Sequence, residues 1–173
     1  ILASGLLLLG LSVLRSIDVL LSLFVVFRWS LLVVVGLVVY QVAREIGFRL
    51  LYAFCAQGFF QASLGLYQFF TQSLMGSKWF GMSTQLPQTL GVSVVENNIG
   101  RWLRAYGSFG WPTSLGMYLA VAIVMSAILF VYTKNKFVRI SLLIMIPGML
   151  AGLFVTFARG AWLATGVGLV YIF

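Results

Sequence analysis

The chain has 173 residues, of which 62% are hydrophobic and only 8% are charged. A soluble domain carries about 25% charged residues, so this composition excludes a globular surface that faces water on all sides. The net charge of +8 argues against a nucleic-acid partner, because the basic residues are not gathered on one polar face.

The residue types that are rare or missing limit the chemistry further. There is no His, which excludes a His-based zinc site and a Ser-His triad within this chain, and we expect no metal ion or other cofactor. The single cysteine, Cys55, rules out an internal disulfide. It stands in an apolar run, which indicates a packing role.

Apolar runs dominate the chain and predict an all-α, multi-pass transmembrane helical bundle. A helix crosses the bilayer with about 20 predominantly apolar residues. We expect about six spans in one partial transmembrane domain over residues 1–173, with the first and last spans truncated. Both ends stand inside apolar runs, without an initiator Met or a basic leader, which we interpret as an internal fragment of a longer protein. The expected spans are residues 1–14, 17–40, 48–74, 112–133, 138–157 and 161–173.

The connections between these spans differ in length and charge. Basic residues are densest at residues 41–49 and 134–139, and cytoplasmic loops collect Lys and Arg. We therefore place these two connections in the cytoplasm and the long loop 75–111 on the outer side of the membrane. Long loops are often functional, and this one is amphipathic.

Small residues recur at intervals of four in the last two segments. Gly148 and Gly152 form one pair, and Gly160, Ala164 and Gly168 form a longer series. Small-residue faces let helix backbones approach closely in lipid, so we expect tight packing at both places.

Glutamines form a polar face on the segment 48–74, with spacings that match a helical period. One interpretation is hydrogen bonding between helices. A compatible one is the wall of a polar cavity, for which Gln61 and Gln68 are the candidate lining residues. The four glutamines are Gln57, Gln61, Gln68 and Gln72.

Arg28 stands in the middle of the segment 17–40. A charge at mid-bilayer costs roughly 2.5–3.5 kcal/mol on insertion scales, and Asp18 would lie about 15 Å away along a helix. Either Arg28 faces the interior of the bundle, or residues 15–28 lie at the membrane interface.

Three arginines and one acid are the candidates for chemistry on the outer side. Arg101 and Arg104 would share a face on a helical turn, and two forked guanidiniums suit a diphosphate. Their alternative is an aromatic-basic belt at the lipid headgroups. Arg159, in the tight turn FARGAWLA, is either a third anion-binding residue or a snorkelling arginine. Glu96 is either a general base or the ion-pair partner of an arginine.

Four runs, YQFF, GVSVVE, RWLRAYGSFGWPTSLGMYLA and FARGAWLA, resemble the O-antigen ligase and O-antigen polymerase superfamily of bacterial envelope proteins. The resemblance covers roughly residues 12–173 and is most specific over Arg101–Gly116 and at Arg159 and Gly160. It implies a glycosyltransferase of the bacterial inner membrane. Such an enzyme takes a glycan from an undecaprenyl diphosphate carrier at the outer face and transfers it to lipid A–core or to another glycan acceptor.

The resemblance also assigns roles to residues. It implies that Arg101, Arg104 and Arg159 hold the diphosphate without a metal ion, and it leaves Glu96 as the candidate base for the acceptor hydroxyl. Where the family often has Pro followed by Asn, this chain has Pro112–Thr113, which puts any role of that amide in question. A second outer loop with further catalytic residues is expected beyond the last residue, so the fragment alone is expected to be inactive.

Two other functions stay open on the sequence. A transporter or flippase of lipid-linked glycans would explain Arg28 and the glutamine face as a pathway, but it predicts internal repeats, and we find none. A non-catalytic membrane scaffold would leave the outer arginines dispensable.

Overall fold

The structure is a computed structural model, and it describes residues 19–74, 76, 83–97 and 100–172, with the side chains of 42–45 and 97 left out. The expected span over residues 1–14 and Asp18 lie outside the described residues. The chain divides into two compact units, Ile1–Leu50 and Leu51–Phe173, which are described separately below.

Helix α2 (Val19–Thr71) passes from the first unit into the second, and its helical dihedral angles are interrupted at Ile46 (φ −125°, ψ 23°). In the first unit, Val19–Gln41 forms a 23-residue stretch, and most of its apolar side chains are exposed. A helix that is apolar all round suits lipid as its solvent. The expected span 17–40 is thus confirmed as a helix long and apolar enough to cross a membrane, and Arg28 lies exposed on its surface.

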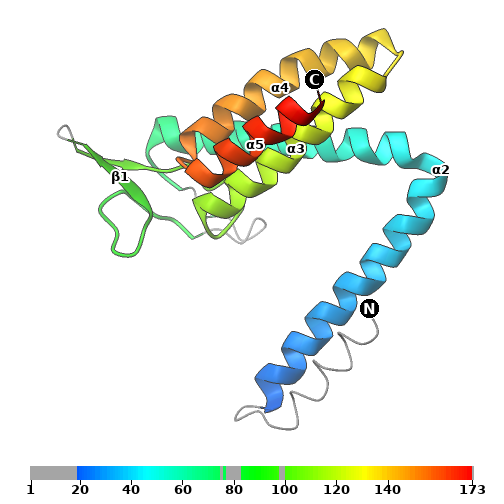
Figure 1. The fold of residues 1–173 in the computed structure, drawn as a ribbon. Helices are drawn as coiled ribbons and strands as arrows, with labels where there is room; N and C mark the ends of the chain where they lie inside the picture. Colours follow the sequence, from blue (N-terminus) through cyan, green and yellow to red (C-terminus); the bar gives the residue numbers. More distant parts are fainter. Residues whose placement is uncertain (1–18, 75, 77–82, 98–99, 173) are drawn as a thin grey trace. The chain divides into compact units, whose positions relative to one another are not determined.

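The second unit contains the rest of α2, a β-hairpin and three further helices (Figure 1). These helices are α3 (Pro112–Tyr132), α4 (Lys136–Val155) and α5 (Arg159–Ile172). Pro112 opens α3, where its missing N–H does no harm, and the side chain of Asn135 caps α4 by accepting a hydrogen bond from the Phe137 N–H. The expected segments 112–133, 138–157 and 161–173 match these helices to within a few residues.

Three helical stretches among the described residues are long and apolar enough to cross a bilayer, namely Val19–Gln41, Pro112–Tyr132 and Lys136–Val155. The expected count of about six spans is therefore not supported. Helix α5 has 14 residues, fewer than a span requires, and the glutamine face makes the second part of α2 less apolar than the other helices.

Helix α4 packs tightly on α2 through small residues. A Cβ atom added at Gly152 would lie 2.9 Å from the Cα atom of Ala62, and one added at Gly148 would contact the ring of Phe59. The expected close approach at this glycine pair is confirmed. Around it lies the main core of the unit, whose largest buried side chains include Leu115, Leu119, Ile123, Met149 and Leu153.

The small-residue series of α5 is only partly used for packing. A Cβ atom at Gly168 would lie 2.7 Å from the side chain of Val124 on α3, whereas one at Gly160 would meet nothing within 4 Å. The expectation of tight packing along the whole series is therefore wrong at Gly160, which stands at the start of α5 beside open space.

The described residues are mostly helical, as expected, but the long loop also contains two short strands. Strands β1 (Val94–Asn97) and β2 (Gly100–Leu103) pair antiparallel, with Val94 opposite Leu103. The runs VSVV and RWL are rich in β-branched and aromatic residues, and the residues NNIG between them favour a turn. A small apolar cluster of Leu74, Val92, Leu103 and Tyr106 anchors this part of the loop.

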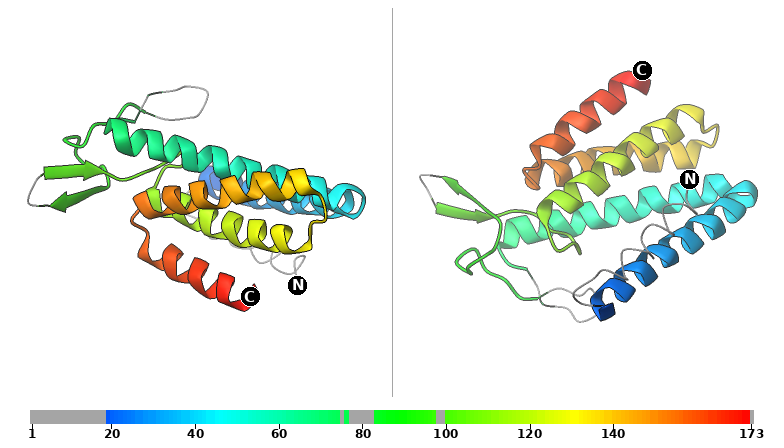
Figure 2. Two further views of the ribbon diagram at one scale, coloured as in Figure 1. Left: turned by 90° about the horizontal axis from the view of Figure 1, so that it is seen from above. Right: turned by 60° about the horizontal axis from the view of Figure 1, so that its bottom comes forward.

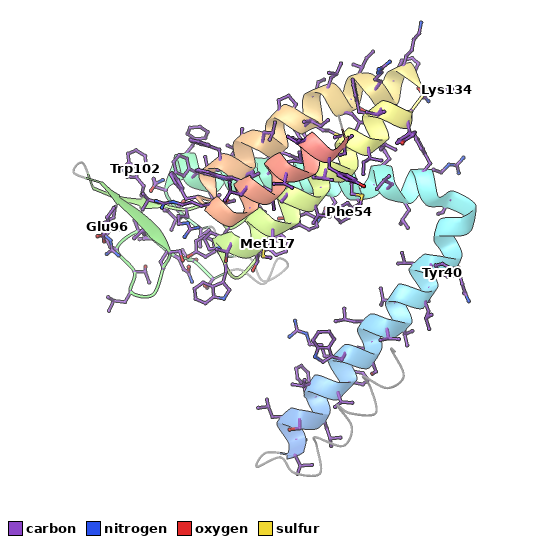
Figure 3. The ribbon with its side chains drawn as sticks, viewed as in Figure 1. Tyr40, Phe54, Glu96, Trp102, Met117 and Lys134 are labelled. Atoms are coloured by element: carbon purple, nitrogen blue, oxygen red, sulfur yellow. The ribbon has the colours of Figure 1, made fainter. Side chains whose placement is uncertain are left out.

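The β-hairpin and the turn between α3 and α4 lie at opposite ends of the second unit, as both views in Figure 2 show. We call these the hairpin end and the turn end. Lys134 marks the turn end, and Glu96 and Trp102 mark the hairpin end (Figure 3). The expectation that the basic residues at 134–139 and the loop arginines lie at opposite ends is confirmed within this unit.

Candidate functional site

The residues Leu103–Ser108, which we call the linker segment, lead from β2 toward α3 and lie against α2. Gln68 is buried at this contact. Its Oε1 accepts hydrogen bonds from the N–H groups of Tyr106 (3.1 Å) and Gly107 (2.8 Å), and its Nε2 donates to the carbonyl of Gly107 (2.8 Å). One side-chain amide therefore satisfies three backbone groups of a loop.

Two other glutamines contact the same segment, Gln61 from α2 and Gln72 from the position just after α2 ends at Thr71. The φ of Gln72 is +52°, so the expected helical face does not extend to this residue. Gln61 accepts from the Ser108 N–H (3.0 Å) and donates to the Ser108 hydroxyl (2.8 Å). Gln72 accepts from the Leu103 N–H (2.7 Å), whereas Gln57 is exposed. The glutamines form hydrogen bonds, but these bonds reach a loop rather than a second helix. Bonding between helices therefore stays a prediction, as does the cavity wall at Gln61 and Gln68.

The other side of the linker segment contacts the end of α4. The Ala105 N–H donates to the carbonyl of Val155 (3.1 Å), and Nε of Arg104 donates to the carbonyl of Thr156 (2.7 Å). The last carbonyls of a helix carry partial negative charge, so a guanidinium is well placed there. Burial lowers the pKa of Arg104, and the nearby Tyr106 opposes this shift, but a guanidinium stays protonated in proteins.

Arg104 and Arg159 line the same cavity, which has a volume of about 520 Å³ and which we call the arginine cavity. Neither Asp nor Glu is among its lining residues. Two guanidiniums beside one cavity repel each other unless an anion lies between them. The other lining residues are Thr113, Met117, Ala120, Val121, Phe157, Ala158, Gly160, Ala161 and Ala164.

Two helices begin at the wall of the arginine cavity. Thr113 lies in the first turn of α3, and Arg159, Gly160 and Ala161 form the start of α5. A helix N-terminus carries partial positive charge and favours an anion, but neither helix has an acidic residue in its first turn. Arg159 adds a full positive charge at such an end, so the local potential favours an anionic ligand.

Phe157 connects α4 to α5 in a backbone conformation that side chains rarely adopt. Its φ is +53°, which costs a non-glycine residue of order 1–3 kcal/mol. Its ring packs against Phe69 and Phe154, and these contacts hold the turn that leads directly into Arg159. No local pattern indicates this conformation, because it depends on contacts with side chains of α2 and α4.

Arg101 is not among the residues that line the arginine cavity. Residues Gly100–Leu103 form a strand, so the expected helical turn that would place Arg101 and Arg104 on one face is wrong. Arg101 instead forms an ion pair with Glu96 (3.1 Å), its partner across the hairpin. Both side chains are exposed, at 42% and 71%, and exposed ion pairs stabilise by about 0–1 kcal/mol.

Aromatic residues surround the same end, as the belt interpretation predicted. Trp102 is 43% exposed and its ring stacks on Phe69 (6.1 Å between centroids), and Trp111 is 61% exposed where α3 begins. Tyr106 is buried, and its hydroxyl oxygen accepts a hydrogen bond from the N–H of Ser93 (2.6 Å), the residue before β1. The two tryptophans fit a belt, whereas Tyr106 does not, and neither excludes an anion site beside them.

No protein-family model matches the chain, and neither the curated proteins nor the solved structures include a match.

Proposed function

We propose that this chain is part of a bacterial inner-membrane glycosyltransferase of the O-antigen ligase or polymerase type. Its donor is a glycan on undecaprenyl diphosphate, and its acceptor is lipid A–core or another glycan. The proposal rests on the arginine cavity, which both Arg104 and Arg159 line and which lies at the end of apolar helices.

The chemistry needs groups that stabilise a leaving diphosphate. The acceptor hydroxyl oxygen attacks the anomeric carbon, the bond from that carbon to the diphosphate oxygen breaks, and the diphosphate leaves with the electron pair. Guanidiniums at a partly dry membrane edge stabilise this developing charge. Arg104 and Arg159 are proposed for this role. Glu96, the only carboxylate whose side chain the structure describes, is proposed as the base that takes the acceptor proton. For this role it has to leave its ion pair with Arg101 and reach the cavity, because it is not among the lining residues.

The cavity also suits the lipid part of the donor. Met117, Ala120 and Val121 of α3 and Ala164 of α5 give it an apolar wall that continues from the arginines along the helices. A free sugar nucleotide would gain nothing from this wall, whereas an isoprenoid chain would be buried against it. A lipid-linked donor is therefore favoured over a soluble one.

Membrane orientation follows from the charges at the turn end. Lys134, Lys136 and Arg139 lie there, and short basic connections stay in the cytoplasm. We therefore propose that the hairpin end faces outward.

A flippase or transporter is less well supported. It would use the glutamine face as a polar pathway, but the buried amides of Gln61 and Gln68 are hydrogen-bonded to the linker segment. These amides therefore bind the linker segment and do not face a polar pathway.

The proposal is tested by turnover of undecaprenyl-diphosphate glycan in the full-length protein that contains this chain, reconstituted in vesicles without an ion gradient. We expect Arg104→Ala and Arg159→Ala each to reduce kcat about 100- to 1000-fold, as removal of one stabilising donor does. Arg139→Ala, at the turn end, is the matched control and should leave kcat unchanged. Wild-type turnover in both cavity variants would overturn the proposal.

A further inference from the structure

The glutamine ladder, which we define as Gln61, Gln68 and Gln72, bonds to the linker segment in reverse chain order. Gln61 binds residue 108, Gln68 binds residues 106 and 107, and Gln72 binds residue 103. The linker segment therefore runs antiparallel to α2, and the three amides contact it at three separate places.

Every backbone N–H of the linker segment has a hydrogen-bond acceptor. Four of these N–H groups, at residues 103, 106, 107 and 108, donate to the glutamine ladder. The remaining two, from Arg104 and Ala105, donate to the carbonyls of Ser93 and Val155. A buried backbone group without a partner is costly, so a shift of the segment by one residue would break most of these bonds at once.

Close approach of the backbone makes this contact possible. Gly107 has a φ of +60°, and a Cβ atom there would lie 2.8 Å from Oε1 of Gln61 and 3.0 Å from the side chain of Leu115. On α2, a Cβ atom at Gly65 would lie 3.2 Å from the side chain of Ala105. The φ of Gly107 favours glycine, and the short contacts at Gly65 show that the linker segment lies close to the backbone of α2.

We infer that the glutamine ladder is a positioning device for the anion site: it fixes the register of the linker segment and so directs Arg104 toward the arginine cavity. Glutamine suits this role because its amide both donates and accepts hydrogen bonds. Glutamine also carries no charge, so it does not compete with an anionic ligand for Arg104, as a glutamate would. The inference rests on the proposed function for the identity of the ligand, but the register itself can be tested without a ligand.

The first experiment measures the reaction of Arg104 with phenylglyoxal, followed by peptide mass spectrometry on the chain in lipid nanodiscs. Arg101 in the same chain is the internal standard. We expect Gln68→Met, which keeps the side-chain length but removes the amide, to raise the modification rate of Arg104 about five- to tenfold, the effect of losing one or two net hydrogen bonds. Gln57→Met, on the exposed part of the same helix, should leave the rate unchanged.

The second experiment is a double-mutant cycle on the binding of inorganic pyrophosphate, measured by isothermal titration. Gln68→Met should weaken binding about five- to tenfold in the wild-type background and should have no effect in the Arg104→Ala background, since the glutamine acts through that arginine. A role that is merely structural would weaken binding equally in both backgrounds, and that result would overturn the inference.

The outcomes separate the inference from the proposed function. Absence of pyrophosphate binding to the wild type, together with faster modification of Arg104 in Gln68→Met, would refute the anion site and leave the positioning role standing. Pyrophosphate binding that is insensitive to Gln68→Met, with an unchanged modification rate, would refute the positioning role alone. If Gln68→Met does not fold, Gln61→Met, which affects only residue 108, serves in both experiments with the same expected direction.

Discussion

The two ends of the second unit carry similar numbers of cationic side chains but hold them differently. At the turn end the cations are exposed and surround a short turn, and the Arg139 guanidinium lies 4.7 Å from the centre of the Phe130 ring. At the hairpin end, Arg104 is half-buried, bonded to the end of α4, and shares a cavity with Arg159. Arg159 is exposed like the cations of the turn end, so a shared cavity and the partial burial of Arg104, rather than charge alone, distinguish a candidate anion site from a basic turn.

Among substitutions that compare the two ends, the largest effect is expected from replacing the guanidinium of Arg159 by an ammonium group, which keeps the charge. Arg159→Lys should lower kcat/KM for undecaprenyl-diphosphate glycan about 10- to 100-fold, because an ammonium cannot make the paired hydrogen bonds of a guanidinium. Arg139→Lys at the turn end should have no effect. Equal effects of the two substitutions would mean that the two ends do not differ in function.

The next effect concerns packing at the hairpin end. A Cβ atom at Gly116 would lie 2.6 Å from that of Ala158 and 3.1 Å from Oγ1 of Thr156, so Gly116→Ala should destabilise the fold by about 1–3 kcal/mol. Gly160→Ala is the control, since nothing lies within 4 Å of its Cβ position. Thermal unfolding in detergent measures both, and a stable Gly116→Ala would show that α3 and the α4–α5 turn can separate there.

A smaller effect is expected at the turn end. Asn135→Ala removes the hydrogen bond from the Phe137 N–H to the cap of α4 and should reduce stability by about 1 kcal/mol. Because this cap is remote from the arginine cavity, pyrophosphate affinity should not change. A loss of affinity in this variant would show that the turn end and the arginine cavity are coupled.

The smallest effect is expected for the exposed ion pair of the hairpin. Arg101→Gln should reduce stability by less than about 1 kcal/mol, and this loss should shrink further at high salt. Since Arg101 does not line the arginine cavity, pyrophosphate affinity should fall less than about threefold for such a charge at a distance. A loss as large as that of Arg104→Gln in the same titration would place Arg101 within the site.

The helices of the second unit could be predicted well from the sequence. Pro112 opens an uninterrupted apolar run, and the short polar turn around Asn135 separates it from the next, so local composition alone sets these boundaries. The proximity of Arg104 and Arg159 was also predictable in part, because both stand at the same end of alternating helices. Their shared cavity was not, because it depends on how α3, α4 and α5 pack.

Other features depend on contacts that a local pattern does not contain. The glutamine face was recognised, but its partner lies far along the chain, so helix and loop partners could not be told apart. The hairpin was missed because the spacing of Arg101 and Arg104 was interpreted as helical, although the run VSVV and the residues NNIG favoured strands and a turn. A search for alternating β-branched residues within the loop would have found it.

The central claim is that Arg104 and Arg159 bind one diphosphate together, and isothermal titration of pyrophosphate into the chain tests it most directly. Arg104→Gln and Arg159→Gln should each weaken binding by about tenfold or more, the effect of a lost charged hydrogen bond. The double variant should lose less than the sum of the two free-energy changes, because both groups contact the same ligand. Affinity equal to that of the wild type in both single variants would contradict this claim.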